Sequence, residues 1–171
     1  MTTAMNELNI YSKSKDPRGR LLSNFAVTPF ELDGIQIRSL EGMLQGIKFP
    51  EGDARREQAF GTAGLAAKVL GRKATWTGMV FWNGSAIEFG SDEHRALLIR
   101  GLEAKFAQCA EAREALLATG DLTLVHRLAV FARRKKTSNP SSSTKTSLPN
   151  AKYCEALMAI RSRLRSSASA V

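Results

Sequence analysis

Three polar residues in the stretch SLEGMLQGIKF (39–49) have types and spacing that could act on a bound substrate. Glu41, Gln45 and Lys48 follow one another at i, i+4 and i+7, which would place them on one face of a helix. Apolar residues occupy most of the positions between them. Such a polar seam is either one edge of an ordinary amphipathic helix or the wall of a polar pocket, and the local pattern leaves both interpretations open.

Other familiar catalytic arrangements do not occur in the sequence, which has no glycine-rich phosphate loop, nucleophile elbow or H-E-x-x-H motif. The two histidines, His94 and His126, are isolated, and Cys109 and Cys154 do not form a C-x-x-C pair. We therefore expect no metal, no cofactor and no disulfide framework. The sequence also has no run of about 18 apolar residues and no signal-peptide pattern, so we expect a cytoplasmic protein.

Turn and cap signals predict the elements that must hold the seam in place. Asp33-Gly34 and Asn83-Gly84 each separate two short strand-like runs, and such dipeptides favour the tight turn of a β-hairpin. Helices are predicted over 39–49, 55–70, 92–109, 111–118 and 151–164, with Gly71 and Gly120 as stops and Ser91 and Asn150 as N-caps. The stretch LTLVHRLAVF (122–131) is predicted as a strand, or as a strand entering a loop.

Together these elements predict a small, mostly helical single domain of the α+β class with short strands. The chain has 171 residues, which is enough for one sizeable core. We expect an N-terminal segment over 1–20, one domain over 21–165 and a frayed tail over 166–171. Within the domain, residues 133–149 join a basic run to serine, threonine and proline, which predicts a mobile basic loop.

The positive charge is concentrated in the last quarter of the chain. The net charge is +9, yet residues 1–126 hold 15 basic and 15 acidic residues. Residues 127–171 hold ten basic residues and a single acid, Glu155. Such a patch attracts polyanions through counterion release, which favours nucleic acid as a partner. The alternative is a solvated tail that serves only solubility.

Seven short motifs follow one another along the chain: L-S-N-F (22–25), P-F-x-L-D-G (29–34), S-L-E-x-x-x-Q-x-x-K-F (39–49), A-x-x-L-G-R (67–72), A-K-F-x-Q (104–108), L-L-A-T-G (116–120) and L-M-x-I-R (157–161). They occur in the order seen in the NADAR, or YbiA-like, N-glycosidases, and the chain resembles that family from about residue 20 to residue 163. Each motif is weak alone, but the ordered set is specific. The resemblance implies a YbiA-like α+β fold, no metal, and cleavage of an N-glycosidic bond in ribosylamine-like or ADP-ribose-like substrates.

The resemblance implies that Glu41 is catalytic, because it stands where the pattern S-x-E-H-x-x-Q-A-x-K-F has the family's principal catalytic residue. Breaking a C–N bond at an anomeric carbon builds positive charge on the sugar. A carboxylate beside that carbon stabilises this charge or activates the attacking water. Gln45 and Lys48 are expected to hold or polarise the substrate from the same helix face.

Further matches to the family's motifs are expected to bind the substrate. Ser23, Asn24 and Phe25 correspond to S-N-F, and Phe25 could stack on a base. Arg72 and Lys105 correspond to L-G-R and A-K-F, and they could bind phosphate or sugar oxygens. The alternative for these two is an ordinary charge on a helix surface.

Three positions depart from the family pattern beside the expected pocket. Gly42 and Gly46 replace a histidine and an alanine, so we expect them to widen the pocket for a bulkier substrate group. Close helix packing is the alternative explanation. Trp82 is expected to replace an aromatic that often precedes the family's long helix, and it could stack on a base.

The largest departure lies before the last helix, where many family members carry D-x-x-W-G-x-G and this chain carries the basic loop. The usual second acid is therefore missing. Asp121, Asp92 and His126 are the candidates that could replace it as a second acid or base.

We therefore predict an N-glycosidase, a hydrolase that removes a modified nucleobase from DNA as a DNA glycosylase and leaves an abasic site. A modified base would also fit a role in phage defence. The residues expected to bind DNA are Arg133, Arg134, Lys135, Lys136 and Lys145. Three alternatives are an ADP-ribosyl hydrolase acting on nucleic acid or nucleotide, an N-glycosidase of small phosphoribosyl metabolites, and a non-catalytic nucleic-acid-binding module. The oligomeric state and the identity of the base stay open.

Overall fold

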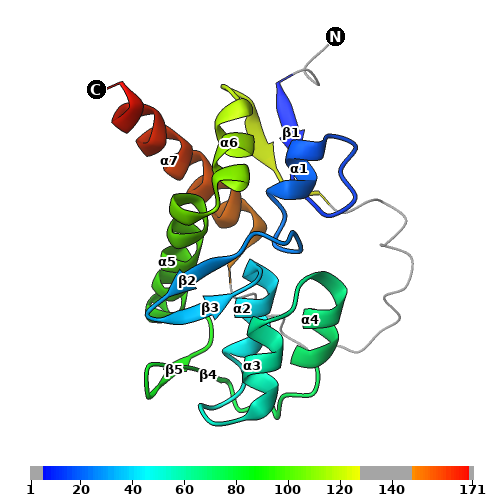
Figure 1. Cartoon of the computed structure of the whole chain (residues 1–171), viewed down its shortest axis with the longest axis vertical. Helices are drawn as coiled ribbons and strands as arrows, with labels where there is room; N and C mark the ends of the chain where they lie inside the picture. Colours follow the sequence, from blue (N-terminus) through cyan, green and yellow to red (C-terminus); the bar gives the residue numbers. More distant parts are fainter. Residues whose placement is uncertain (1–5, 128–147, 170–171) are drawn as a thin grey trace.

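The computed structural model describes residues 6–127 and 148–169 as a small α+β fold (Figure 1). It confirms the predicted fold class. The helices are α1 (Pro17–Leu21), α2 (Leu40–Gly46), α3 (Ala54–Phe60), α4 (Gly64–Gly71), α5 (Asp92–Gln108), α6 (Ala110–Ala118) and α7 (Asn150–Ala168). The strands are β1 (Glu7–Asn9), β2 (Phe30–Leu32), β3 (Ile35–Ile37), β4 (Met79–Trp82), β5 (Ser85–Glu88) and β6 (Thr123–Val125).

Both predicted hairpins are confirmed. Strands β2 and β3 pair antiparallel around Asp33-Gly34, and β4 and β5 pair antiparallel around Asn83-Gly84. Asp33 and Asn83 have φ of 51° and 49°, and the glycines that follow have φ of 81° and 74°. These left-handed pairs match the two-residue hairpin turn that the dipeptides favour.

The N-terminal segment contributes two elements that local patterns did not predict. Strand β1 pairs in parallel with β6, so that Leu8 lies opposite Leu124. This pairing confirms a strand within the predicted stretch 122–131. Helix α1 follows, with Asp16 as its N-cap and Pro17 in its first turn.

The predicted helix over 55–70 is wrong, because the chain forms two helices, α3 and α4, with a break at 61–63. The break has a structural use. The carbonyl of Thr62 accepts a hydrogen bond from Ser39 Oγ at 2.9 Å, and Ser39 is the N-cap of α2. A continuous helix would have kept that carbonyl in its own ladder.

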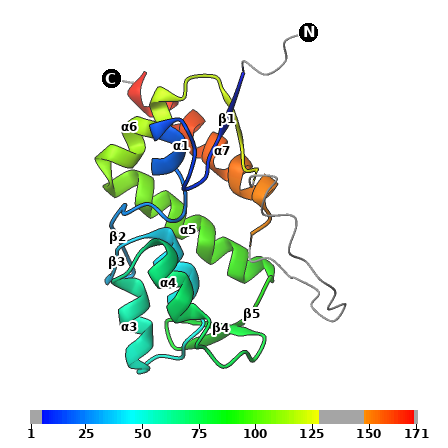
Figure 2. The ribbon, with the colours of Figure 1, turned by 90° about the vertical axis from the view of Figure 1, so that its right-hand side faces the viewer.

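Helix α5 runs through the middle of the molecule and contacts both halves of the fold (Figures 1 and 2). As predicted, Ser91 caps it, and Ser91 Oγ accepts a hydrogen bond from the His94 N–H at 3.2 Å. Its apolar stripe, which includes Leu97, Leu102 and Phe106, is buried in the core. The two hairpins and α2–α4 lie around one half of α5, and α1, α6 and α7 lie around the other (Figure 2).

The last helix differs from its prediction at both ends. Pro149 occupies the N-cap, and the cap has no side-chain hydrogen bond, so Asn150 is the first helical residue and not the cap. The helix also continues through Ala168, into the segment predicted to fray. Arg161 ties it down by donating to Thr119 Oγ at 2.7 Å and to the Leu122 carbonyl at 2.9 Å.

Candidate active site

Helix α2 is fixed at its first turn by two distant segments. Ser39 Oγ accepts a hydrogen bond from the Gly42 N–H at 2.9 Å, which satisfies one of the free donors of the helix start. The Glu41 N–H donates to the Asn24 carbonyl at 3.0 Å. The backbone that carries Glu41 is therefore held by the S-N-F segment on one side and by the α3–α4 break on the other.

The polar seam is a continuous hydrogen-bonded relay. Lys48 Nζ donates to Gln45 Oε1 at 2.6 Å, and Gln45 Nε2 donates to Glu41 Oε1 at 2.8 Å. The helix ends at Gly46, two residues earlier than Lys48, but the turn that follows keeps the lysine on the same face. The ammonium polarises the amide, and the amide then stabilises the carboxylate. Glu41 Oε2 makes no hydrogen bond with the described residues.

Burial shifts the pKa of both ionisable groups of the seam. Glu41 is only 6% exposed and Gln45 is 8% exposed. Burial raises the pKa of Glu41, and the hydrogen bond from Gln45 and the charges of Lys68 and Lys48 partly offset that rise. Burial likewise lowers the pKa of the half-buried Lys48, against the pull of Glu41. The pKa of the acid is thus raised and the pKa of the base is lowered within one relay. Shifted pKa values of this kind are typical of catalytic and binding sites.

Helix α4 adds Lys68, a residue that the sequence patterns did not single out. Its charge acts on both Glu41 and Lys48, and its Nζ lies 5.8 Å from the centre of the Phe25 ring. A lysine within the stretch AAKVL is typical of an ordinary helix surface, and only the packing of α4 on α2 reveals its position. The Lys68 ammonium thus interacts both with the Glu41 carboxylate and with the face of the Phe25 ring in the S-N-F motif.

The S-N-F segment adjoins the start of α2, and its three residues play different parts. Ser23 is buried, and its Oγ accepts a hydrogen bond from the Phe25 N–H at 3.3 Å. Asn24 Oδ1 is buried without a hydrogen-bond partner among the described residues. Phe25 is half-buried. Ser23 thus shapes the loop, whereas Asn24 and Phe25 are placed where they could contact a ligand.

The prediction that Gly42 and Gly46 widen the pocket is wrong. A Cβ at Gly42 would lie 2.6 Å from the carbonyl oxygens of Ala59 and Thr62, and one at Gly46 would overlap the Phe60 ring. The glycines therefore allow α2 and α3 to pack closely, which was the alternative explanation.

Trp82 is a residue of the hydrophobic core. Its side chain is 4% exposed and packs edge-on against Phe60, with ring centres 6.1 Å apart. Its indole Nε1 donates to Asp33 Oδ2 at 2.7 Å. The tryptophan joins the two hairpins within the core, so the predicted role in base stacking is wrong.

The two predicted phosphate-binding residues lie in contrasting surroundings. Arg72 caps the end of α4 and is exposed, so it is available to a ligand. Lys105 is fully buried in α5, and its Nζ has no hydrogen-bond partner among the described residues. Burial lowers the pKa of Lys105 to about 8. Both interpretations offered for Lys105, a ligand contact and a surface charge, are contradicted by its burial.

The three candidates for a second acid or base differ in their exposure and in their position relative to the S-N-F segment. Asp121 is 93% exposed and pairs with Arg165 at 2.8 Å, which lowers the pKa of the carboxyl. Asp92 lies exposed in the first turn of α5. His126 is half-buried, lines a small cavity together with Asn24, and has a pKa lowered by burial. Of the three, His126 is the one placed beside the S-N-F segment.

The predicted DNA-binding residues Arg133, Arg134, Lys135, Lys136 and Lys145 lie outside the described residues. No group of three or more His, Cys, Asp or Glu side chains within 6–127 and 148–169 could hold a metal ion. In the same part of the chain, no helix has the length and apolar character that crossing a membrane requires.

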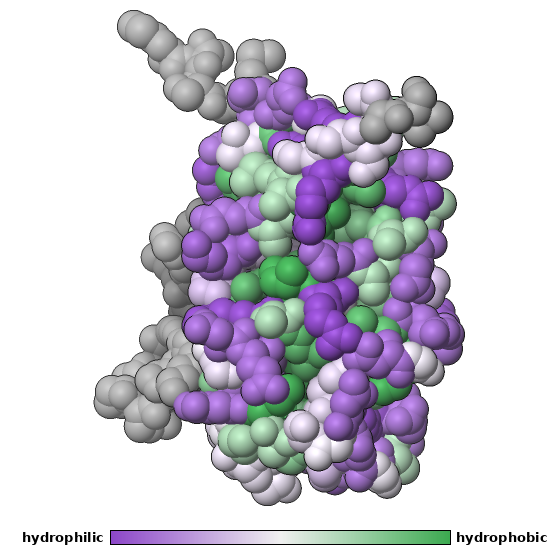
Figure 3. Space-filling model, turned by 90° about the vertical axis from the view of Figure 1, so that its left-hand side faces the viewer, coloured by the Kyte–Doolittle hydropathy of each residue, from purple (hydrophilic) through white to green (hydrophobic). Residues whose placement is uncertain are grey.

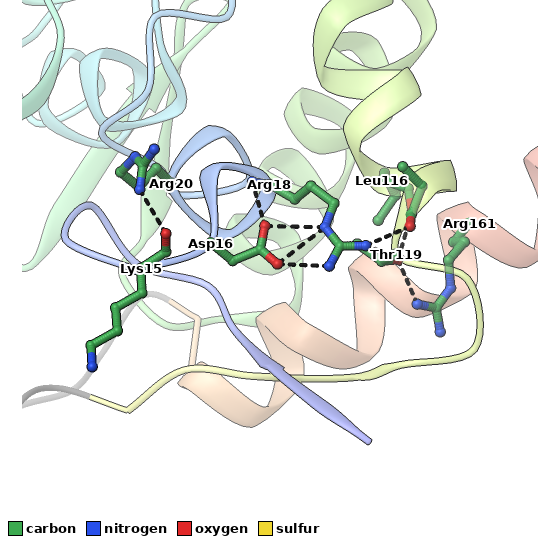
Figure 4. Close-up of polar contacts among 8 residues, drawn as sticks. Lys15, Asp16, Arg18, Arg20, Leu116, Thr119 and Arg161 are labelled. Carbon is green, nitrogen blue, oxygen red and sulfur yellow. Dashed lines mark hydrogen bonds and ion pairs between the residues drawn. The ribbon is translucent and has the colours of Figure 1, made fainter. Parts of the chain in front are cut away.

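A groove of about 500 Å³ opens between α1 and α6, and Phe25 lines it as well. Its arginines are already engaged (Figure 4). Arg18 pairs with Asp16 at 2.6 Å and donates to the Ala118 carbonyl at 2.7 Å, while Arg20 donates to the carbonyls of two neighbouring loop residues. Glu111 adds a negative charge. The groove is therefore poorly suited to phosphate, and Glu41 is not part of its lining.

Comparisons with known proteins identify a family, one relative and one similar fold. The model of a family described as bacteriophage protein GP30.3 matches residues 17–162. An Enterobacteria phage T4 protein described as "Uncharacterized 17.1 kDa protein in Gp30-rIII intergenic region" is 38% identical over 128 residues, which cover 73% of this chain and 83% of that protein. The NMR structure of the E. coli protein YbiA is similar with a TM-score of 0.59 and 24% identity, covering 96% of this chain and 91% of that one. The fold is therefore YbiA-like.

Proposed function

The chain belongs to the bacteriophage protein GP30.3 family, and from that premise we propose that it is an N-glycosidase related to the NADAR proteins that removes a base from DNA. One observation carries this proposal. A buried carboxylate, Glu41, is held by Gln45 and Lys48 in a relay that leaves Oε2 without a partner among the described residues. A YbiA-like fold presents that relay, and the family motif for the catalytic glutamate falls on Glu41.

The proposed reaction is the hydrolysis of the bond between C1′ of a deoxyribose and a base nitrogen. As this bond breaks, its electron pair leaves with the base, and positive charge develops at C1′ and the ring oxygen. The Glu41 carboxylate stabilises that charge, and water supplies the hydroxyl group that ends on C1′. The products are a free base, which takes up a proton, and an abasic site. The hydrogen bond from Gln45 and the charge of Lys48 both favour the ionised carboxylate.

Two side chains near the relay suit a base that has left the helix. Phe25 offers a ring for stacking. The Lys68 ammonium lies near that ring, and its charge also acts on the Glu41 carboxylate. His126, neutral because burial lowers its pKa, is the candidate for a second base. The predicted DNA-binding residues Arg133, Arg134, Lys135, Lys136 and Lys145 would hold the phosphates of the same DNA.

Base removal is favoured over ADP-ribosyl hydrolysis because of one structural finding. An ADP-ribosyl hydrolase was expected to bind the pyrophosphate of its substrate through Arg72 and Lys105. Lys105 is fully buried, so one of the two phosphate ligands is lost. A small-molecule substrate would leave the net charge of +9 without a role, and a purely binding module would leave the relay without one.

A role in the phage cycle fits the proposal better than bacterial defence. The matched family takes its description from a bacteriophage protein, GP30.3, and one relative comes from phage T4. An enzyme of this kind would act on host DNA or on the phage's own modified DNA.

The proposal is tested by incubating the protein with duplex DNA that carries natural or modified bases, followed by heating in alkali. Alkali cleaves the strand at abasic sites, so strand breaks report base loss. The expected result is cleavage by the wild-type protein and by Glu114→Gln, an exposed control on α6, but not by Glu41→Gln. Release of free ADP-ribose from ADP-ribosylated DNA without strand breaks would favour the alternative instead.

A further inference from the structure

Helix α4 and the loop after it carry an unusual concentration of exposed apolar side chains. Within the described residues, the exposed large hydrophobic side chains are Val27, Leu65, Val69 and Trp76. Three of these four fall between residues 65 and 76, with Trp76 57% exposed and Leu65 64% exposed. Figure 3 shows another face of the molecule, on which hydrophilic residues alternate with apolar patches. An exposed cluster of this kind marks a contact surface.

Basic residues interleave with the apolar ones. Lys68, Arg72 and Lys73 are all exposed, and the chain has no acid between residues 58 and 87. We use the name α4 surface for this set, which comprises Leu65, Lys68, Val69, Arg72, Lys73 and Trp76. Apolar and aromatic side chains among exposed cations suit a ligand that has both flat rings and negative charges, as nucleic acid does.

Trp76 is held in place although it is exposed. Its ring packs edge-on against Phe89 at 4.8 Å between ring centres, and Phe89 contacts the His94 ring at 4.9 Å. His94 is fixed in turn, because its Nδ1 accepts a hydrogen bond from the Gly90 N–H at 2.9 Å. A ring that is braced from one edge and open to solvent can stack on a base with little loss of side-chain entropy.

The α4 surface adjoins the candidate active site. Helix α4 packs on α2, and Gly71 lies directly against Gln45 of the relay. Lys68 belongs both to the surface and to the charges that act on Glu41. Figure 1 shows α4 beside α2, on the opposite half of the molecule from α7.

From this position and composition we propose that the α4 surface docks the DNA strand next to the base presented to Glu41. Arg72 and Lys73 contact phosphates, and Trp76 stacks on a neighbouring unpaired base. The proposal rests on the proposed function, because it takes the strand beside the reacting base as the occupant. It adds a binding surface within the described residues, separate from the predicted basic loop at 133–149.

The test measures DNA binding, which needs no turnover. Fluorescence anisotropy with short labelled single-stranded DNA gives the Kd at several salt concentrations for each variant. Arg72→Ala/Lys73→Ala should weaken binding and reduce the slope of log Kd against log salt by roughly 1.4, since about 0.7 of a counterion is released per contact on a single strand. Trp76→Ala should weaken binding roughly tenfold, and Trp76→Phe should restore most of it.

The matched control is Lys13→Ala/Lys15→Ala, which removes the same charge from two exposed positions before α1. Equal affinities and slopes for the two double variants would overturn the proposal. Loss of binding to anionic lipid vesicles on Trp76→Ala, with DNA affinity unchanged, would overturn it in favour of a membrane surface. Because binding is measured without catalysis, inactivity of the wild-type enzyme on every DNA would count against the proposed function and not against the surface.

Discussion

Gly71 of α4 lies so close to Gln45 of α2 that a Cβ at position 71 would overlap the Gln45 side-chain amide. The amide is also the middle member of the relay between Lys48 and Glu41. Gly71 therefore serves the candidate active site, although it touches neither the carboxylate nor the lysine in the relay. The glycine of the A-x-x-L-G-R motif is explained by this contact, and not by the end of a helix alone.

Gly71→Ala should displace the Gln45 amide and so damage the relay. We expect a loss of base-removal activity of roughly tenfold or more, together with a destabilisation of about 1–3 kcal/mol from overpacking. Steady-state kinetics and thermal unfolding check the two effects. Ala66→Ser, on the exposed face of the same helix, should leave both unchanged. Normal activity of the Gly71→Ala protein would show that the Gln45 position does not matter.

Lys48→Met should remove the cation at the far end of the relay. The pKa of Glu41 should then rise further, because the Lys48 charge is one of the factors that lower it. We expect activity at neutral pH to fall by roughly 100-fold and the acidic limb of the pH profile to move to higher pH. Lys13→Met, at an exposed position, is the control. An acidic limb that stays in place in Lys48→Met would contradict the relay.

The pH dependence of kcat/KM should be bell-shaped. Activity requires ionised Glu41, whose pKa is raised above 4.5, so it should rise with pH through an inflection above that value. Activity also requires protonated Lys48, whose pKa is lowered below 10.5, so it should fall through an inflection below that value. A profile that is flat from acidic to neutral pH would contradict a catalytic carboxylate.

Lys105→Met should stabilise the protein at neutral pH, because it removes a buried amine without a hydrogen-bond partner among the described residues. The folded-state pKa of Lys105 is about 8 against an ordinary 10.5, so folding disfavours the charged amine. The cost of burying the charged amine is therefore fully present below pH 8 and disappears as the pH rises through 10.5. The gain in Tm should therefore be a few degrees at pH 7 and should shrink towards pH 10. Unchanged or lower Tm at pH 7 would contradict this account.

Local signals predicted most of the elements. The Asp33-Gly34 and Asn83-Gly84 turns and the Ser91 cap depend on a few neighbouring residues, and all three are confirmed. The spacing of Glu41, Gln45 and Lys48 likewise placed them together, because a helix converts sequence spacing directly into a shared face.

What sequence reasoning missed depends on contacts between distant segments. The α3–α4 break makes sense only once Ser39 donates to the Thr62 carbonyl. The burial of Trp82 follows from its bond to Asp33 in the other hairpin, and the close packing at Gly42 follows from the approach of α3. Lys68 enters the site because α4 packs on α2, which no local pattern encodes.

The central claim, that Glu41 drives the hydrolysis of an N-glycosidic bond in DNA, is tested most directly by measuring the released base. Duplex DNA with natural or modified bases is incubated with wild-type, Glu41→Gln and Glu114→Gln proteins, and free bases are quantified by mass spectrometry beside the abasic sites. The account predicts equal amounts of one free base and of abasic sites with the wild-type and Glu114→Gln proteins, and neither product with Glu41→Gln. Equal base release by Glu41→Gln and the wild-type protein would contradict it.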